Sequence, residues 1–363
     1  MTTLSLSMIV KNEEQTIERV LACARTFCDE MVVVDTGSTD RTVEIAQQMG
    51  AKVYHFAWVE DFSAARNYSL DCCTGDWVLW LDADDMISEA CQQRFREIKE
   101  QTLNDKLDAV CMPYYYCFDA QGNCSYTNIR ERMFRRAAGL RWHHPIHEVV
   151  YVSSDKTLPL NDVWIEHRPL PDRDALHSGR NMRILEKSIE NGDEHPRMIY
   201  LYARELKNTN QIEKAVLYYQ KYLSLNPYGS RTRSEIYDVL MGMAWSYKKL
   251  GRIEESKDCL FKAINADSRR AEAYNELGFI CYEKEDWEMA IPYFRTGANA
   301  RKPLNEDLIA DEHYTWLPNE YMSLCYAFMK DYRTALEIAI KCLPHHPMKE
   351  NLIKNMHWFI DNI

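Results

Sequence analysis

The sequence predicts two domains, an α/β domain followed by an all-α domain of stacked helix pairs. Strand-like and helix-like segments alternate through the first hundred residues, which is typical of an α/β fold. From about Asp174 the pattern is helical to the end, and small residues recur there at regular intervals. A chain of 363 residues has room for two or three domains. We place the boundary between residues 185 and 186.

The first domain begins with four predicted strands separated by helices or turns. Val32–Val34 is a β-branched run inside one strand, and apolar residues at helical spacing mark the helix after the first strand. Asp40 is a candidate cap for the second helix. The predicted strands are Leu4–Val10, Met31–Asp35, Lys52–Phe56 and Trp77–Leu81, and the helices are Glu13–Phe27, a segment ending at Met49, and Phe62–Cys72. This alternation predicts a mostly parallel sheet with helices on both faces.

A second part of this domain follows a different pattern. Ala109–Phe118, Arg130–Phe134 and Glu148–Val152 look like strands separated by loops rich in His and Arg. We expect them to extend the first sheet as a mixed sheet.

The helical half contains an internal repeat. Ala215, Ser256, Ala290 and Ala335 occupy one register, and Ser256 and Ala290 lie 34 residues apart, the spacing of tetratricopeptide repeats. The other two intervals, 41 and 45 residues, are longer, so we expect loops at Tyr228–Ser234 and Lys302–Thr315. Small residues let paired helices approach closely. The pattern predicts a tetratricopeptide-like superhelix over residues 186–363.

Composition limits the possible partners. The formal net charge of −11 argues against nucleic acid and against an anionic membrane surface. The 12 cysteines include no CxxC pair, which favours free thiols in a reducing cytosol. The apolar start at Leu4–Val10 is too short for a signal segment, and no run of 18 apolar residues predicts a membrane span. We therefore expect a cytoplasmic protein.

An acidic tip follows the fourth predicted strand. Asp82 and Asp84, two residues apart in a turn, can point to one side and suit a hard divalent cation held against a diphosphate. The alternative is a solvated acidic loop. Ligands of such sheets bind beyond the carboxyl ends of the strands, where Asp35 also lies. Asp35 can accept a hydrogen bond from a uracil N3–H. The strand end at Asn12 and Glu13 would flank the base.

Four motifs follow one another in the first domain: MIVKNEE at 8–14, VVVDTGSTDRT at 32–42, DFSAARNYSL at 61–70 and WVLWLDADD at 77–85. RERMFRR, the His147–Glu148 pair and Arg180–Asn181 come later. In this order, the motifs resemble those of the family 2 glycosyltransferases of the A-type fold, over roughly residues 1–185. Repeats behind such a domain are similar to the arrangement in bacterial peptide S-glycosyltransferases of the sublancin type.

This resemblance implies a role for each matching residue. Asp35 would bind the base, and Arg66 would contact the base or a phosphate. Asp84 would bind the metal directly, and Asp82 would contact the ribose or the metal. His147 would be a further metal or diphosphate ligand. The expected cofactor is Mn²⁺ or Mg²⁺, and the expected donor substrate is a UDP-sugar.

Roles near the acceptor stay open between alternatives. Glu148 is either the general base or the residue that orients His147. Asp85 is a candidate for a sugar-hydroxyl contact, or it is exposed. We expect Arg132 and Arg135 either to bind a phosphate or to pair with the acidic loops. His147 can instead belong to a structural cluster with His143 and His144, while His167 is a second histidine that can face the site. Tyr114–Tyr116 is expected to be strand packing rather than a sugar platform.

The sequence therefore predicts an inverting, metal-dependent glycosyltransferase whose acceptor is a peptide or protein side chain bound by the repeats. Alternatives are transfer to a cell-surface glycan precursor, an inactive repeat adaptor, and a nucleotidyltransferase. No Gln-x-x-Arg-Trp element occurs, which disfavours a polysaccharide synthase. The apolar end Trp358–Ile360 suits self-capping or a homodimer.

Overall fold

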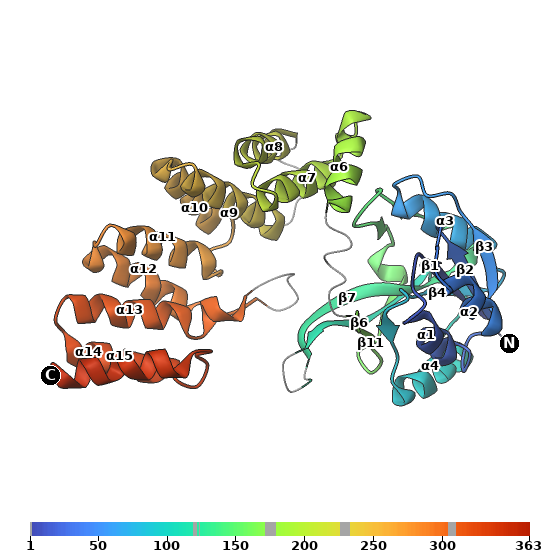
Figure 1. Ribbon diagram of the computed structural model, residues 1–363, viewed down its shortest axis with the longest axis horizontal. Helices are drawn as coiled ribbons and strands as arrows, with labels where there is room; N and C mark the ends of the chain where they lie inside the picture. Colours follow the sequence, from blue (N-terminus) through green and yellow to red (C-terminus); the bar gives the residue numbers. More distant parts are fainter. Residues whose placement is uncertain (1, 119–121, 123, 171–178, 226–232, 304–309) are drawn as a thin grey trace. The chain divides into compact units, whose positions relative to one another are not determined.

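The computed structural model describes residues 2–118, 122, 124–170, 179–225, 233–303 and 310–363. The chain divides into two compact units, Met1–Asp193 and Glu194–Ile363. The first is an α/β unit and the second is helical (Figure 1). Each is described by itself below.

Four parallel strands form one side of the main sheet, in the order β3-β2-β1-β4. Their bounds are Lys52–His55 for β3, Glu30–Asp35 for β2, Leu4–Val10 for β1 and Trp77–Trp80 for β4. Val10 and Asp35 lie opposite each other at the ends of β1 and β2. The carboxyl ends of these strands therefore share one edge, where parallel sheets bind ligands.

The sheet continues through both antiparallel and parallel pairs, as the mixed pattern of the sequence predicted. Strand β7 pairs antiparallel with β4 and β6, β6 pairs in parallel with β10 and β11, and β11 pairs antiparallel with β5. A separate two-stranded sheet joins β8 and β9. The bounds are β5 Asp85–Met86, β6 Ala109–Phe118, β7 Cys124–Arg135, β8 Trp142–His143, β9 Val149–Val150, β10 Thr157–Pro159 and β11 Ile165–His167.

Side chains alternate between the two faces of the sheet and meet different helices. Leu4, Leu6 and Met8 of β1 join a core with α1 and α4, whereas Val32 and Val34 of β2 pack toward α3 on the other face. Figure 1 shows α1 and α4 on the side of the sheet opposite α3. The helices are α1 Ile17–Ala24, α2 Thr42–Gln48, α3 Phe62–Cys72, α4 Glu89–Gln101 and α6 Arg180–Glu190.

Some boundaries differ from the sequence-based expectation. Helix α4 and the short β5 were not predicted, although Cys91, Phe95 and Ile98 recur at helical spacing in α4; β5 has only two residues and therefore gives no periodic signal. The N-cap of α2 is Arg41, although the Asp40 carboxylate accepts from the Thr42 N–H at 3.0 Å. The predicted strand at 148–152 is only β9, two residues long.

Within its described residues, the second unit contains four helix pairs and a last helix. The predicted register is confirmed, since Ala215, Ser256, Ala290 and Ala335 are all buried in the second helix of a pair. The helices are α7 Pro196–Asn208, α8 Ile212–Leu225, α9 Arg233–Lys249, α10 Ile253–Ala266, α11 Glu272–Glu283, α12 Trp287–Asn299, α13 Leu317–Phe328, α14 Tyr332–Cys342 and α15 Lys349–Asp361.

Most of the two predicted long loops lies outside the described residues, at 226–232 and 304–309. The start of the predicted helical region, at 174–178, lies outside them as well. The second loop does contain a 3-10 turn, η3, at Asp311–Tyr314; the other two 3-10 turns, η1 and η2, are Arg136–Ala138 and Ser154–Lys156.

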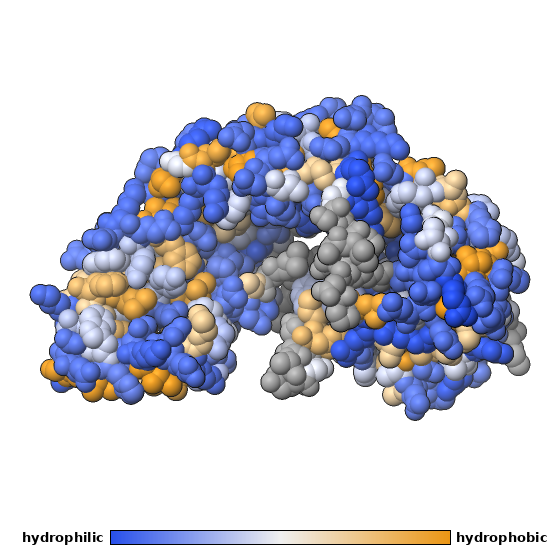
Figure 2. Space-filling view, in the orientation of Figure 1, coloured by the Kyte–Doolittle hydropathy of each residue, from blue (hydrophilic) through white to orange (hydrophobic). Residues whose placement is uncertain are grey.

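The C-terminal helices combine capping with exposed apolar surface. Phe359 of α15 is fully buried against α14, so the end of the helix closes the repeat core. Trp358 and Ile360 are about half exposed, and Figure 2 shows apolar residues along the edge that carries α14 and α15. No helix among the described residues has the length and apolar character needed to cross a bilayer.

Candidate active site

The end of β2 builds a turn around Asp35. This residue is 4% exposed, and its carboxylate accepts from the backbone N–H groups of Gly37 and Ser38 at 3.2 and 3.0 Å. Gly37 has φ of 106°, a value that favours glycine. The His55 Nδ1 lies 3.4 Å from Asp35 Oδ2. These contacts fix the Asp35 carboxylate at the sheet edge.

Asn12 and Glu13 hold the neighbouring loop against this turn. The Asn12 side chain accepts from the Thr39 N–H at 2.8 Å, and the Asn12 N–H donates to the Ser38 hydroxyl at 2.9 Å. The Glu13 N–H donates to the Thr42 hydroxyl at 2.6 Å. These contacts join the β1 and β2 loops into one wall beside Asp35.

The acidic tip after β4 is fixed from several sides. The Asp82 N–H donates to Asp85 Oδ2 at 2.9 Å, which closes the turn. The Asp84 carbonyl accepts from the Arg168 N–H at 2.9 Å and from the Arg19 guanidinium at 3.1 Å. Because the backbone is held in this way, the directions of the three carboxylates are set before any ligand binds.

Asp85 lies beneath the tip and is fully buried. Its carboxylate accepts from the Tyr114 hydroxyl at 2.8 Å and pairs with Arg132 at 3.1 Å. The Arg132 guanidinium is also buried, between the rings of Trp80 and Tyr114 at 3.8 and 4.1 Å. Of the two alternatives for Arg132, the structure shows the pairing with the acidic segment. Arg135 pairs with Asp108 instead.

Arg66 of α3 links the acidic tip to the loop at residues 143–148, which has the sequence HHPIHE and carries Glu148. Its Nε donates to Glu148 at 2.6 Å and its Nη2 donates to Asp82 at 2.9 Å. The guanidinium lies 4.7 and 5.2 Å from the centres of the Trp80 and Trp142 rings. Burial opposes the charge on Asp82, but Arg66 outweighs it and lowers the pKa of Asp82. Two carboxylates far apart in the sequence thus share one guanidinium.

Asp84, Asp85 and His167 form a group that can hold a cation. One ligand atom from each lies within 4.8 Å of the others. His167 Nδ1 is 3.6 Å from Asp84 Oδ1 and 2.9 Å from the Tyr114 hydroxyl.

The charges of this group fit a cation as well as its geometry does. Burial and the neighbouring charges of Asp82 and Asp85 raise the pKa of Asp84 to about 7. A divalent cation relieves this crowding of negative charge, and carboxylate oxygens suit Mn²⁺ or Mg²⁺.

His147 lies on the loop beside Glu148. It is exposed, with φ of 51°, and is not part of the three-residue group found among the described residues. His144 bonds to the Tyr151 hydroxyl at 2.9 Å, and the His143 ring packs on the same tyrosine. Phe62 donates its N–H to the Pro145 carbonyl at 2.8 Å, which ties the loop to α3. The loop that carries His147 therefore stays beside the Arg66 bridge.

Sequence reasoning missed several residues of this site. Trp80, Trp142 and Arg19 had no assigned role, and Tyr114 was expected only to pack. Alternation along β4 places Trp80 on the same face as Val78. Nothing in the sequence indicates that the guanidinium groups of Arg66 and Arg132 pack on the Trp80 ring. Arg19 lies on the polar side of an amphipathic helix, a position that gives no functional signal.

The first unit is thus an α/β domain with acidic side chains at the carboxyl edge of its parallel strands, and the second unit is a helical-repeat domain. Residues 5–153 match the family described as glycosyl transferase family 2. Residues 196–228 and 237–269 match tetratricopeptide repeats. The chain thus carries a family 2 glycosyltransferase domain followed by tetratricopeptide repeats.

Two curated relatives are similar to long parts of the chain. A TPR repeat-containing protein of Synechococcus elongatus is 34% identical over 216 residues, which are 56% of this chain and 51% of that protein. The SPbeta prophage-derived glycosyltransferase SunS of Bacillus subtilis is 26% identical over 234 residues, 62% of this chain and 54% of that protein. The chain spans about half the length of these relatives.

Two solved structures are each similar to about half of the chain. Glucosyl-3-phosphoglycerate synthase from Mycobacterium tuberculosis has a TM-score of 0.38 at 20% identity, covering 53% of this chain and 80% of that one. The TPR protein YrrB has a TM-score of 0.37 at 20% identity, covering 49% and 82%.

Proposed function

We propose that the protein is an inverting glycosyltransferase that moves a sugar from a nucleotide diphosphate, most simply a UDP-hexose, to a peptide or protein side chain. The observation that carries the proposal is the acidic tip, Asp82–Asp85, which follows β4 at the same carboxyl edge of the parallel strands as Asp35 of β2, with β1 between the two strands. Asp35 would accept from the base. The family match of residues 5–153 supports the reaction class.

Asp84 is proposed as the direct ligand of the divalent cation. The resemblance adds Asp82 and His147 as ligands, and the geometry adds Asp85 and His167. Such a cation would stabilise the negative charge that develops on the leaving diphosphate. Arg66 positions Asp82, whereas Arg132 positions Asp85 and compensates its buried charge. Positioning and electrostatics would then account for most of the rate acceleration.

Glu148 is proposed as the group that takes the acceptor proton. Its carboxylate is oriented by the hydrogen bond from Arg66 Nε. In Glu148→Gln, turnover should fall by about 10²-fold or more while donor binding is retained, because the amide cannot accept the proton. A single-turnover assay beside a donor titration separates these two effects.

The donor site is tested by thermal unfolding with a panel of nucleotide diphosphates, with and without Mn²⁺. We expect one nucleotide to raise the midpoint only when the cation is present, since a ligand that binds the folded state stabilises it. Asp84→Ala should abolish this rise. No rise with any nucleotide would contradict the proposal and leave the repeat domain as an adaptor. Release of pyrophosphate instead of nucleotide diphosphate would indicate a nucleotidyltransferase.

Two histidines compete for the cation, and single substitutions distinguish them. If the imidazole near Asp84 is the ligand, His167→Ala should weaken Mn²⁺ binding by about tenfold or more, and His147→Ala should leave it nearly unchanged. The reverse result would assign the ligand that the resemblance implies. Mn²⁺ binding is measured by isothermal titration, and His143→Ala, in the same loop as His147, is the control.

A further inference from the structure

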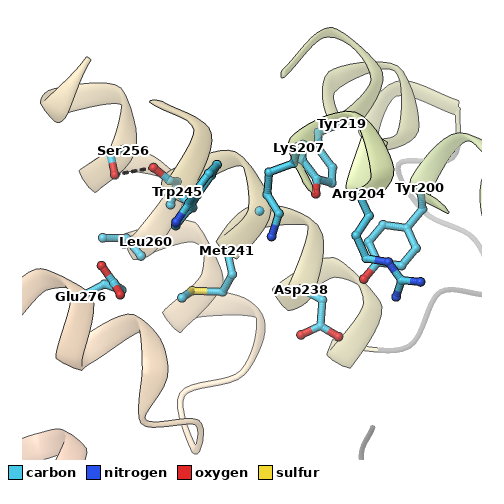
Figure 3. A pocket seen from close by; sticks show the side chains of 12 residues that line it. Tyr200, Arg204, Lys207, Tyr219, Asp238, Met241, Trp245, Ser256, Leu260 and Glu276 are labelled. Atoms are coloured by element: carbon cyan, nitrogen blue, oxygen red, sulfur yellow. Dashed lines mark hydrogen bonds between the residues drawn. The ribbon is translucent and has the colours of Figure 1, made fainter. Parts of the chain in front are cut away.

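Buried polar side chains gather at a hollow in the repeat unit as well as at the acidic tip. The hollow has a volume of about 220 Å³, and Figure 3 shows Asp238 and Glu276 among the side chains around it. Both carboxylates lie beside cations of the repeats, Asp238 at 2.8 Å from Arg270 and Glu276 at 3.8 Å from Lys248. These carboxylates are thus matched by cations, unlike the crowded carboxylates of the acidic tip.

At the acidic tip, the Tyr114 hydroxyl joins a buried carboxylate to an imidazole. It lies 2.8 Å from Asp85 Oδ1 and 2.9 Å from His167 Nδ1. Three neighbouring strands set this arrangement, because β11 pairs with both β5 and β6, and His167 lies opposite Asp85 in the pairing with β5. The His167 ring also stacks on the Tyr116 ring, with 4.7 Å between the ring centres. The fold therefore holds the three groups in contact.

The direction of these hydrogen bonds follows from the charge of Asp85. This carboxylate pairs at 3.1 Å with the fully buried Arg132, so its ionised form is needed to compensate the guanidinium. Burial raises the pKa of Asp85 to about 6, which leaves the carboxylate ionised at about pH 8. An ionised carboxylate only accepts hydrogen bonds. Its Oδ2 accepts from Arg132 and from the Asp82 N–H at 2.9 Å, and its Oδ1 accepts from Tyr114.

The hydroxyl of Tyr114 has a single hydrogen, which it donates to Asp85. Its oxygen can then only accept from His167, so the imidazole hydrogen lies on Nδ1. The other group near Nδ1 is Asp84 Oδ1 at 3.6 Å, which is again a carboxylate oxygen. A neutral imidazole with its hydrogen on Nδ1 carries its lone pair on Nε2.

We propose that Tyr114 and Asp85 are positioning residues that keep the His167 hydrogen on Nδ1 and so present the Nε2 lone pair to a divalent cation. Asp85 belongs to the group that can hold a cation, but its two oxygens already accept from three donors. It therefore serves as the anchor of the Tyr114 hydroxyl. Partners of this kind fix the ring and the tautomer of a metal-binding histidine. Only the binding of the cation rests on the proposed function; the position of the hydrogen does not.

The position of the hydrogen is tested in the full chain in the presence of a chelator. The ring nitrogens of its 11 histidines are isotope-labelled, and proton–nitrogen NMR spectra are recorded at about pH 8, where an ordinary imidazole is neutral. The His167 signals are those that disappear in His167→Gln. We expect the Nδ1–H form in the unaltered chain. Tyr114→Phe should raise the share of the Nε2–H form, because Nδ1 loses its acceptor.

A second variant, Asp85→Asn, tests the direction of the hydrogen bonds. The amide oxygen would face the two donors from Arg132 and Asp82, and the amide NH₂ would donate to Tyr114. The Tyr114 hydroxyl would then donate to Nδ1, which moves the His167 hydrogen to Nε2. Circular dichroism first checks that this variant folds, since Arg132 loses its counterion. Tyr114→Phe keeps that ion pair and decides the test by itself if Asp85→Asn does not fold.

Binding of Mn²⁺ to the same proteins is measured by isothermal titration. Tyr114→Phe should weaken this binding by about tenfold to a hundredfold, the usual effect of losing such a partner of a metal ligand. Tyr115→Phe is the matched control, because it removes a hydroxyl from the next residue of β6, whose ring stacks on Trp164 instead. The control should bind Mn²⁺ like the unaltered chain and keep the His167 hydrogen on Nδ1.

An Nε2–H form in the unaltered chain would overturn the inference, and so would a Tyr114→Phe spectrum that equals that of the unaltered chain. The Nδ1–H form without any binding of Mn²⁺ would remove the proposed function and leave the position of the hydrogen intact. Binding of Mn²⁺ that Tyr114→Phe does not weaken would do the opposite, since it would support the cation site and overturn the role of Tyr114.

Discussion

At the scale of single residues, the site depends on charged groups that are paired before any ligand arrives. Arg66 holds Glu148 and Asp82, and Arg132 holds Asp85. Removing one partner of the fully buried Asp85–Arg132 pair costs about 3–5 kcal/mol, because the other charge is left uncompensated. Loss of activity after substitution at Asp85 or Arg132 therefore needs a stability measurement beside it.

Glu30 offers a test of this electrostatic reasoning outside the active site. It accepts from Lys52 at 2.7 Å and from the Thr74 N–H at 2.8 Å, and Ser5 also donates to it. Burial opposes its ionisation, but these donors outweigh burial and lower its pKa to about 2.

Because the folded-state pKa of Glu30 is the lower one, its stabilising contribution is present above about pH 4.5 and is lost as the pH falls toward 2. Glu30→Gln should cost about 1–3 kcal/mol at pH 7 and much less at pH 3. Urea unfolding at both pH values measures the change in the free energy of unfolding that the substitution causes. Glu44→Gln, on an exposed helix, is the control. An equal cost at both pH values would contradict the assignment.

At the scale of elements, the repeat helices approach closely where small residues meet aromatic ones. A Cβ added at Gly278 of α11 would lie 2.7–2.9 Å from atoms of the Phe294 ring on α12. Phe294 is fully buried, so its ring has little room to move. The sequence spacing predicted that small residues separate the paired helices, and this contact supplies the physical reason.

Gly278→Ala should therefore destabilise the repeat unit by about 1–3 kcal/mol, although alanine is the better helix former. Thr296→Ala, at an exposed position of α12, should change stability by less than about 0.5 kcal/mol. Chemical denaturation followed by circular dichroism compares the two. A stabilised Gly278→Ala protein would show that the helices can separate without cost.

At the scale of the whole molecule, the chain consists of two compact units with cores of different kinds. One core lies between a sheet and its helices, and the other lies between paired helices. Units of this kind commonly unfold as separate cooperative transitions.

Calorimetry should accordingly resolve two components. Nucleotide with Mn²⁺ should raise the midpoint temperature of the transition that belongs to Met1–Asp193. Gly278→Ala should lower the midpoint temperature of the transition that belongs to Glu194–Ile363. One transition that moves as a whole in both experiments would show that the units unfold together.

The sequence by itself determined the alternation of strands and helices over the first eighty residues, the repeat register and the acidic tip, because these depend on local periodicity and on spacing along the chain. Only the tertiary structure brought Tyr114 to Asp85 and His167, and Arg66 to Glu148, since these residues lie on elements far apart in sequence. It also decided that the guanidinium of Arg132 is buried between two rings. Such contacts depend on how side chains fill the space between packed elements, and local patterns carry no signal for that.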